Sequence, residues 1–454
     1  MISSVIPGLV WPAVPNQQHA ALLALQFQLE QSQWWSPEKI AAHQMQQANV
    51  LLAHAANTVP YYQTFLPDLL ADNHGVIDWQ SWRKIPILER TDIQQQGDAL
   101  VSQNIPQSHL PISGGKTSGS TGRPIELLKT SVTGLIWCAL TLRGHLWHQR
   151  DLTAKLATIK AFPAQQLPDE GVQLQGWGPS TDMFLPLAPA AVLSVHLPIK
   201  HQLAWLQNQD AVYLLSYPSN LAALAEESLK QNVKLPMLRE VIAMGEKLTQ
   251  QQRQICREAW QVEIKDMYSA EEIGYIAHQS PLNDSYLVQA EHVIVEVLDA
   301  NGEQCKPGEV GRVVVTTLNN FAKPLIRYAI GDYAEVGEHS PCGHGLPVLN
   351  QIMGRTRNML IKPDGEMFWP NMPNLADEYV QRMPSVRQYQ YVQKAPDWIE
   401  LRIAAEDSFP KDIEQAFIDA IHRDFGYRYR VTFSYLKEIP RGENQKYEEF
   451  VSEL

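Results

Sequence analysis

The sequence has little positive charge, no basic run and no long apolar run. It contains 37 Lys+Arg against 49 Asp+Glu, which gives a net charge of −12. Nucleic acids are bound largely through lysines and arginines that neutralise phosphates, so this balance excludes a typical nucleic-acid-binding protein. No uninterrupted apolar run reaches the roughly 18 residues of a membrane-spanning helix. We therefore expect neither a nucleic-acid partner nor a membrane span.

The sequence also lacks paired cysteines and a basic N-terminal start. Its four cysteines, at positions 138, 256, 305 and 342, show no paired spacing, which fits a reducing compartment. Residues 1–15 are apolar but do not begin with the basic residues of a secretory signal peptide. These absences predict a cytoplasmic protein. With 454 residues, 44% of them hydrophobic, the chain is long enough for two or three domains.

Two common nucleotide-binding patterns are missing as well. No strand-like segment is followed by G-x-G-x-x-G, which argues against a Rossmann-type dehydrogenase. Gly115-Lys116-Thr117 resembles the end of a Walker A loop, G-x-x-x-x-G-K-[ST]. The first glycine of that pattern would have to be residue 110, which is Leu110. We therefore reject the Walker A assignment.

What the sequence does contain is a stretch rich in glycine and hydroxyl groups, Thr-Ser-Gly-Ser-Thr-Gly-Arg-Pro at 117–124. The two glycines allow positive φ, so several backbone N–H groups can point toward one anion, and the hydroxyls add short donors. The predicted phosphate ligands are Ser118, Gly119, Ser120, Thr121 and Gly122. Clusters of Gly, Ser and Thr also occur as plain surface loops, and that alternative stays open for the stretch taken alone.

Apolar periodicity predicts helices at 16–33, 37–57 and 130–149. Between about 152 and 267, strand-like and helix-like segments alternate. The strand-like segments are Leu156–Ile159, Val192–His196, Val212–Ser216, Glu240–Ala243 and Val262–Lys265, and the helix-like ones are 201–208, 219–231 and 248–260. This alternation predicts an α/β fold with a mostly parallel sheet covered by helices. Ligands of such sheets bind at the carboxyl ends of strands, where Tyr217, Gly245-Glu246 and Asp266-Met267-Tyr268 lie.

The C-terminal third has a different pattern. Residues at about 285–350 have the pattern of a smaller β-rich subdomain, with strands at Val293–Leu298 and Gly311–Leu318 and with Ile326–Ile330 and Tyr333–Val336 on either side of Gly331-Asp332. Read alone, Gly331-Asp332 is typical of a turn. The last 100 residues predict a small α+β domain with strands at Trp398–Ile403 and Tyr429–Tyr435 and a helix at 411–423. We therefore predict an N-terminal domain, 1–354, and a C-terminal domain, 355–454.

Several short segments stand in a fixed order around the glycine-rich stretch. They are Lys84–Asp92, Tyr217–Ser219, Gly245-Glu246, Asp266–Glu272, Pro324–Asp332, Gly354-Arg355 and the tail from Pro440-Arg441 to Lys446. Together they resemble the adenylate-forming superfamily of acyl- and aryl-CoA synthetases, adenylation domains and luciferases. The resemblance is closest to its phenylacetate–CoA ligase branch, and it runs from about Tyr61 to Lys446.

The resemblance implies an AMP-forming carboxylic acid ligase with ATP and Mg²⁺ as cofactors. An aryl or other small organic acid is converted to an acyl-adenylate and passed to coenzyme A. Transfer to a carrier protein or an amine is the alternative, and a catalytically inactive nucleotide-binding homologue is a further one. Some relatives are homodimers, and the sequence does not decide whether this chain is one.

The resemblance also implies roles for individual residues. Lys446 is the catalytic lysine and Glu272 the Mg²⁺ ligand, with Glu271 as its neighbouring rival. Tyr268 is implied to stack on adenine, with core packing as the alternative, and Asp332 to accept hydrogen bonds from the ribose. The remaining residues of the implied nucleotide site are Gly245, Glu246, Asp266, Met267, Ser269, Arg327 and Arg355, where both arginines have surface ion pairs as an equal alternative.

The C-terminal domain is implied to act as a mobile lid that rotates between the two half-reactions about a hinge at Arg357. The acid pocket is placed by analogy, with Trp137, Tyr217, Ala243 and Gly245 as candidates, although Trp137 also fits a core position.

Cys342, His344 and His278 are residues of the zinc-binding type, where relatives often carry Cys-x-Cys. A closed structural zinc site needs four ligands, and the sequence shows no fourth. A buried thiol and a turn histidine are the alternative to a zinc site.

Overall fold

The structure is a computed structural model. It describes residues 2–116, 125–162, 167–340, 342–355, 359–365, 367–368, 386, 388–405, 407–439 and 450–454. Contacts divide the chain into two units: the large unit ends at Ile352, and the small unit begins at Met353 and also includes Gly331–Tyr333. Such a boundary does not show that the parts fold or move independently, so the predicted division into domains at residue 354 stays a prediction.

The large unit begins with helices. They are α1 (Gln17–Ser32), α2 (Pro37–Thr58), α3 (Pro60–Gln63), α4 (Leu66–Asp72), α5 (Trp79–Trp82), α6 (Arg90–Gln96) and the 3₁₀ helices η1 (Gly97–Leu100) and η2 (Gln107–His109). The Ser36 side chain accepts a hydrogen bond from the backbone N–H of Lys39 and Pro37 occupies the first turn, so α2 starts where the sequence signals it. The predicted helices at 16–33 and 37–57 are confirmed. No helix within the described ranges is both long and apolar enough to cross a membrane.

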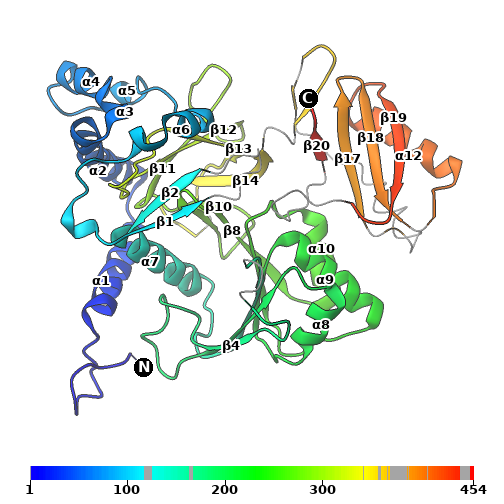
Figure 1. Cartoon of the computed structure of the whole chain (residues 1–454), viewed down its shortest axis with the longest axis horizontal. Helices are drawn as coiled ribbons and strands as arrows, with labels where there is room; N and C mark the ends of the chain where they lie inside the picture. The colour runs from blue at the N-terminus through cyan, green and yellow to red at the C-terminus, as the bar shows by residue number, and fades with distance from the viewer. Residues whose placement is uncertain are drawn as a thin grey trace. The chain divides into compact units, whose positions relative to one another are not determined.

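Two strands and one helix follow. β1 (Ile112–Lys116) pairs antiparallel with β2 (Glu126–Thr130), with Lys116 opposite Glu126. The helix α7 (Ser131–Trp147) begins directly after β2, where Thr130 and Thr133 form a reciprocal capping box. It lies beside α1 (Figure 1).

Twelve strands form one sheet. They are β3 (Leu156–Lys160), β4 (Val172–Gln175), β5 (Pro189–Ser194), β6 (Tyr213–Ser216), β7 (Glu240–Met244), β8 (Glu263–Ala270), β9 (Gly274–Gln279), β10 (Tyr286–Val288), β11 (Val293–Leu298), β12 (Val310–Thr317), β13 (Tyr328–Val336) and β14 (Val348–Arg355). Their order across the sheet is β11-β12-β13-β14-β10-β9-β8-β7-β6-β3-β5-β4.

The sheet is parallel from β5 through β3, β6 and β7 to β8. The helices α8 (Ile199–Gln207), α9 (Pro218–Gln231) and α10 (Gln250–Trp260) lie between these strands in sequence and side by side along this part of the sheet (Figure 1). Their apolar residues, such as Leu203, Leu221 and Cys256, form one core with the strands. The predicted alternation is thus confirmed for this part of the chain.

The rest of the sheet is largely antiparallel, as in the pairs β8–β9, β9–β10, β10–β14 and β11–β12. The strands predicted for a β-rich part therefore extend the same sheet instead of forming a second one. β13 runs through Gly331-Asp332, so the turn that these two residues suggest when read alone is not formed. Gly331 has a φ of +89°, a conformation that glycine adopts at little cost, so the strand passes this point without ending.

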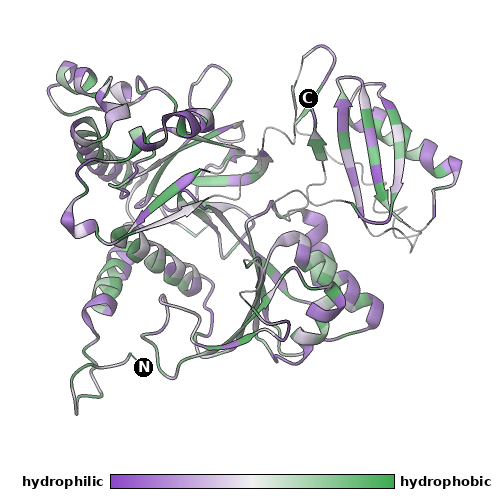
Figure 2. Cartoon of the chain, in the orientation of Figure 1, coloured by the Kyte–Doolittle hydropathy of each residue, from purple (hydrophilic) through white to green (hydrophobic). Residues whose placement is uncertain are grey.

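The small unit has a four-stranded sheet in the order β19-β18-β17-β20, with β17 (Gln388–Ala395), β18 (Trp398–Ala404), β19 (Arg430–Leu436) and β20 (Phe450–Ser452). It also contains α12 (Lys411–Asp424) and the short pair β15 (Leu360–Ile361) and β16 (Met367–Phe368). Along β18, Ile399, Leu401 and Ile403 are fully buried and alternate with more polar residues. Figure 2 shows hydrophobic and hydrophilic bands along the strands of this sheet. The predicted strands and helix of this region are confirmed.

Candidate functional site

Strand register brings three predicted segments to one edge of the parallel sheet. Ser216 pairs with Ala243, which in turn pairs with Asp266, and Met244 pairs with Met267. Tyr217 and Gly245 follow the carboxyl ends of β6 and β7, so both lie next to this row. β8 does not end at this level but continues to Ala270 and turns back into β9. The segment Asp266–Tyr268 therefore lies inside a strand, at the level where β7 ends.

Glu246 connects the end of β7 to the start of α9. Its carboxylate accepts a hydrogen bond of 2.9 Å from the backbone N–H of Ser219, in the first turn of that helix. A helix N-terminus carries partial positive charge, so a carboxylate there is stabilising. Gly245 has a φ of +76°, which allows the chain to turn between strand and cap.

The candidate residues of the acid pocket fall into different surroundings. Ala243 is fully buried in the core beneath α8–α10. Tyr217 accepts a hydrogen bond of 3.2 Å from the backbone N–H of Ala161, just after β3, and burial raises the pKa of its hydroxyl. Trp137, on α7, is 44% exposed and stacks on Tyr275 of β9, with ring centres 5.8 Å apart. The Ala243 side chain packs apart from the Trp137–Tyr275 stack, and the acid pocket stays a prediction.

Alternation along β8 separates the residues of the predicted adenine site. Asp266 and Tyr268 are buried, and Met267 between them is half-buried among different apolar residues. Tyr268 packs in the main core of the large unit, which matches the packing alternative, and its stacking on adenine stays a prediction. Asp266 accepts a hydrogen bond of 2.6 Å from the Tyr286 hydroxyl, and burial raises the pKa of its carboxyl to about 6.

Glu272 lies in the turn between β8 and β9 and points inward, with its side chain only 7% exposed. The Tyr328 hydroxyl donates a hydrogen bond of 3.2 Å to it, and Arg90 Nη1 lies 3.8 Å away. Glu271 is 71% exposed and pairs with Lys129 of β2. The two neighbouring carboxylates therefore face different surroundings.

Glu272 has the chemistry that a magnesium ion requires. Mg²⁺ takes oxygen ligands and keeps several waters, so one or two carboxylates together with substrate phosphates suffice. Within the described ranges, no three His, Cys, Asp or Glu side chains gather as a metal site. The role of Glu272 as a Mg²⁺ ligand stays a prediction.

Arg327 makes structural contacts. Its guanidinium forms two hydrogen bonds with Glu296, of 3.1 and 3.0 Å, and donates to the backbone carbonyls of Arg83 and Ile85. The side chain is buried, so it occupies a buried ion pair and not the surface pair considered from sequence. These contacts use four of its five N–H groups, and they argue against the implied nucleotide contact.

In the small unit, Asp332 and Arg355 contact each other. Arg355 Nε lies 3.5 Å from Asp332 Oδ1, and the two side chains are 40% and 15% exposed respectively. Ion pairing, the alternative for Arg355, is therefore present. A role for either residue toward a nucleotide stays a prediction.

Ser118, Gly119, Ser120, Thr121 and Gly122, together with the hinge residue Arg357 and the catalytic lysine Lys446, lie outside the described residues. The strands β1 and β2 that flank residues 117–124 are described. β2 is held by Asn320, which donates to the Leu128 carbonyl at 2.9 Å, and by Lys323, which donates to the Glu126 carbonyl at 3.0 Å. Lys323 is buried, and this burial lowers the pKa of its ammonium group.

The residues of the zinc-binding type make other contacts. His278 Nε2 forms a hydrogen bond of 3.1 Å with the Leu140 carbonyl, and Cys342 Sγ lies 3.4 Å from Ser280 Oγ. His344 stacks on Trp147, with ring centres 5.3 Å apart, and Trp147 also contacts His278 edge-on. Both histidines are buried, but Cys342 is only half-buried, so the alternative of a buried thiol does not hold for it, and a zinc site here stays a prediction.

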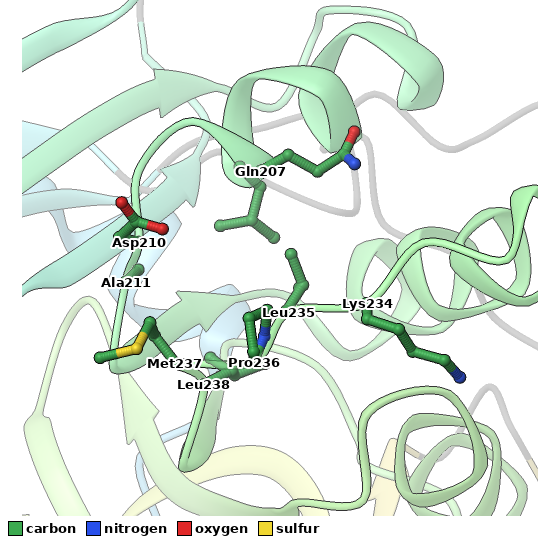
Figure 3. Close-up of a pocket in the computed structure, with 9 residues that line it drawn as sticks. Gln207, Asp210, Ala211, Lys234, Leu235, Pro236, Met237 and Leu238 are labelled. Atoms are coloured by element: carbon green, nitrogen blue, oxygen red, sulfur yellow. The ribbon is translucent and has the colours of Figure 1, made fainter.

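A small cavity lies elsewhere in the large unit (Figure 3). It is lined by the end of α8, Asp210 and Ala211 after it, and residues Lys234–Leu238 before β7. These positions precede β6 and β7, so the cavity is at the amino ends of the strands, opposite Tyr217 and Gly245. Its volume of about 30 Å³ is roughly a tenth of that of a small ligand pocket. It is therefore not the candidate site.

Comparison with known proteins gives consistent results. No protein-family model matches the chain. The chain is 24% identical over 422 residues to the phenylacetate-coenzyme A ligase of Thermus thermophilus, covering 87% of this chain and 89% of the relative. It is 21% identical over 361 residues to the phenylacetate-coenzyme A ligase of Pseudomonas putida, covering 76% of each. The chain is a homologue of the phenylacetate-coenzyme A ligases.

Solved structures agree on the fold of this homologue. A 2-hydroxyisobutyryl-CoA ligase in complex with R3-HIB-AMP matches with a TM-score of 0.71 at 17% identity, covering 93% of this chain and 92% of the other. An anthranilate CoA ligase in complex with anthranoyl-AMP matches with a TM-score of 0.52 at 17% identity, covering 74% and 65%. The chain therefore has the adenylate-forming ligase fold.

Sequence analysis missed four residues that shape this site: Arg90, Asn320, Lys323 and Tyr328. Arg90, Lys323 and Tyr328 lie in or next to segments that resemble the family, yet each contacts a partner far away in sequence. Lys323 and Glu126, for example, are 197 positions apart. The only signal was their position beside the Lys84–Asp92 and Pro324–Asp332 segments.

The Arg327→Met variant tests the structural role of Arg327. Removing the guanidinium leaves the buried Glu296 carboxylate without its charge partner, which typically lowers the free energy of unfolding by about 3–5 kcal/mol. Arg312→Met is the matched control, because it removes a partly exposed pair with Glu89 and should cost about 1 kcal/mol or less. Urea unfolding measures the free energy of unfolding of both variants. Unchanged stability with weaker ATP binding would instead assign Arg327 to the nucleotide.

The Asp266→Asn variant tests the buried carboxyl of Asp266. Burial raises the pKa of this group from 3.8 to about 6, so the folded protein holds the proton more tightly than the unfolded chain does. The group therefore costs stability as pH rises, by about 3 kcal/mol once pH exceeds about 6. Urea unfolding should show that the variant gains this amount at pH 7.5 and about a third of it at pH 4.5. An equal gain in the free energy of unfolding at both pH values would contradict a raised pKa for Asp266.

Proposed function

We propose that the chain is an AMP-forming carboxylic acid ligase that activates an aryl or other small organic acid with ATP and transfers the acyl group to coenzyme A. One observation carries this proposal. The similarity to the Thermus thermophilus phenylacetate-coenzyme A ligase covers 87% of the chain, which is more than the large unit contains, so it extends into the small unit as well. The similarity thus includes residues of both the large unit and the small unit, and a two-step ligase of this kind requires both.

In the first step, a carboxylate oxygen attacks the α-phosphorus of ATP, and the bond to pyrophosphate breaks. The leaving phosphates need hydrogen-bond donors but no covalent partner, and the N–H groups and hydroxyls of Ser118–Gly122 supply such donors. Lys446 stabilises charge on the α-phosphate and the carboxylate. Asp332 accepts hydrogen bonds from the ribose, and Tyr268 with Gly245 and Glu246 borders the adenine. In the second step, the thiolate of coenzyme A attacks the acyl carbon and AMP leaves.

Glu272 would hold Mg²⁺, which would neutralise phosphate charge when bound. The inward orientation and low exposure of Glu272 support this assignment over Glu271, which pairs with Lys129 at the surface. An aryl acid is favoured by Trp137, whose half-exposed indole stacked on Tyr275 offers a flat apolar surface on α7. The four free thiols support a reducing, cytoplasmic location.

Pyrophosphate release from ATP and Mg²⁺ tests the proposal. A panel of aryl, fatty and amino acids is assayed with and without coenzyme A. We expect release that requires one class of acid and accelerates with coenzyme A. The Lys446→Ala variant should lower acid-dependent release by about 10²- to 10³-fold, because it removes charge stabilisation in the transition state. Lys411→Ala, at the exposed start of α12, is the matched control and should change release less than about twofold.

Other outcomes separate the alternatives. Release that is indifferent to coenzyme A would indicate a carrier protein or an amine as acceptor. Tight ATP binding without release for any acid would indicate a catalytically inactive homologue and would contradict the proposal.

A further inference from the structure

We infer that Tyr328 is a positioning residue, which holds one oxygen of the Glu272 carboxylate so that the other oxygen faces the metal ion. The inference rests on the proposed function, in which Glu272 holds Mg²⁺. It adds a residue that acts on the metal through Glu272 without touching the metal itself.

The side-chain contacts of Glu272 with the described residues involve one of its two carboxylate oxygens. Tyr328 Oη donates to Oε1 at 3.2 Å, and Arg90 Nη1 lies 3.8 Å from the same oxygen. Within the described part of the chain, Oε2 makes no hydrogen bond. Oε2 is not one of the buried polar atoms that lack a partner, and an ionised carboxylate has four lone-pair sites, so Oε2 can accept a further ligand. The arrangement therefore leaves one oxygen for a ligand while the protein fixes the other.

Tyr328 is itself held firmly. Its side chain is fully buried in the main core of the large unit, at the first residue of β13. Leu88 pairs with this strand through two backbone hydrogen bonds of 2.9 Å, from Leu88 N–H to the Arg327 carbonyl and from Ala329 N–H to the Leu88 carbonyl. Arg90 follows Leu88 by two residues. Strand pairing thus sets the phenol and the guanidinium on the same side of Glu272.

The two partners of Oε1 have different tasks. The Tyr328 hydroxyl can only donate to a carboxylate, so it fixes the direction of the Glu272 side chain. Arg90 supplies positive charge that balances the carboxylate before any metal binds. Hydrogen bonds to a metal-binding carboxylate orient it, and their loss typically weakens metal affinity by about 10- to 100-fold. A hydroxyl that merely satisfies a buried phenol would have no such effect.

The Tyr328→Phe variant tests the inference, since it removes one oxygen and keeps the ring in the core. The readout is the dissociation constant of a non-hydrolysable ATP analogue, measured by calorimetry with saturating Mg²⁺ and again with EDTA. The ratio of the dissociation constant in EDTA to that in Mg²⁺ reports how much the metal strengthens binding of the analogue. We expect the Phe variant to reduce this ratio about tenfold and to leave the constant in EDTA unchanged.

The matched control is Tyr62→Phe. Tyr62 is also fully buried in the same core, but its hydroxyl donates to the Pro324 carbonyl and accepts from the Ile326 N–H, and these contacts do not involve Glu272. This variant should keep the wild-type ratio even if it lowers the unfolding temperature. A ratio that falls equally in both variants, or stays unchanged in Tyr328→Phe, would overturn the inference.

Glu272→Gln separates the inference from the proposed function. If this variant loses the Mg²⁺ effect while Tyr328→Phe keeps it, Glu272 holds the metal and only the positioning role fails. If Glu272→Gln keeps the full Mg²⁺ effect, the metal assignment itself fails and the inference with it. In the Glu272→Gln background, adding Tyr328→Phe should change the ratio no further, because the two residues act as one unit.

Discussion

A buried positive charge organises the part of the large unit that carries the candidate site. Arg327 is almost fully enclosed, and Glu296 neutralises it through two hydrogen bonds. An uncompensated charge in this position would cost several kcal/mol, so the pair must form whenever the unit is folded. The remaining donors of Arg327 bind the carbonyls of Arg83 and Ile85. The ion pair thereby fixes where the segment after Trp82 runs.

That segment in turn determines the surroundings of Glu272. Once residues 83–85 are held, Leu88 lies beside β13 and pairs with it, and Arg90 begins α6 close to the β8–β9 turn. The same strand presents Tyr328 to Glu272. A charge pair between residues 31 positions apart therefore controls contacts at a turn that neither residue touches. An arginine within a family-like segment can thus shape a site through the backbone and strand that it holds in place.

The sequence predicted the parts of this structure that depend on local patterns. The alternation of strands and helices between 152 and 267 and the Ser36-Pro37 start of α2 follow from periodicity and capping, which act over a few residues. The burial of the Arg327 ion pair, the single sheet and the choice of core packing for Tyr268 could not be decided from the sequence, because they depend on partners far away in sequence. Gly331-Asp332 read alone suggests a turn, because glycine marks turns and continuing strands alike, and only pairing on both sides distinguishes them.

The charges around the β1–β2 hairpin also bear on how a polyphosphate would be bound. Lys129 pairs with Glu271, Lys323 donates to the Glu126 carbonyl, and Arg90 lies beside Glu272. In a chain of net charge −12, these cations already have partners. Besides Lys446, the phosphates of ATP would therefore depend on backbone N–H groups, hydroxyls and a metal ion for stabilisation. On the proposed function, part of the positive charge comes from the metal ion, which is why the orientation of the carboxylate that would hold it matters.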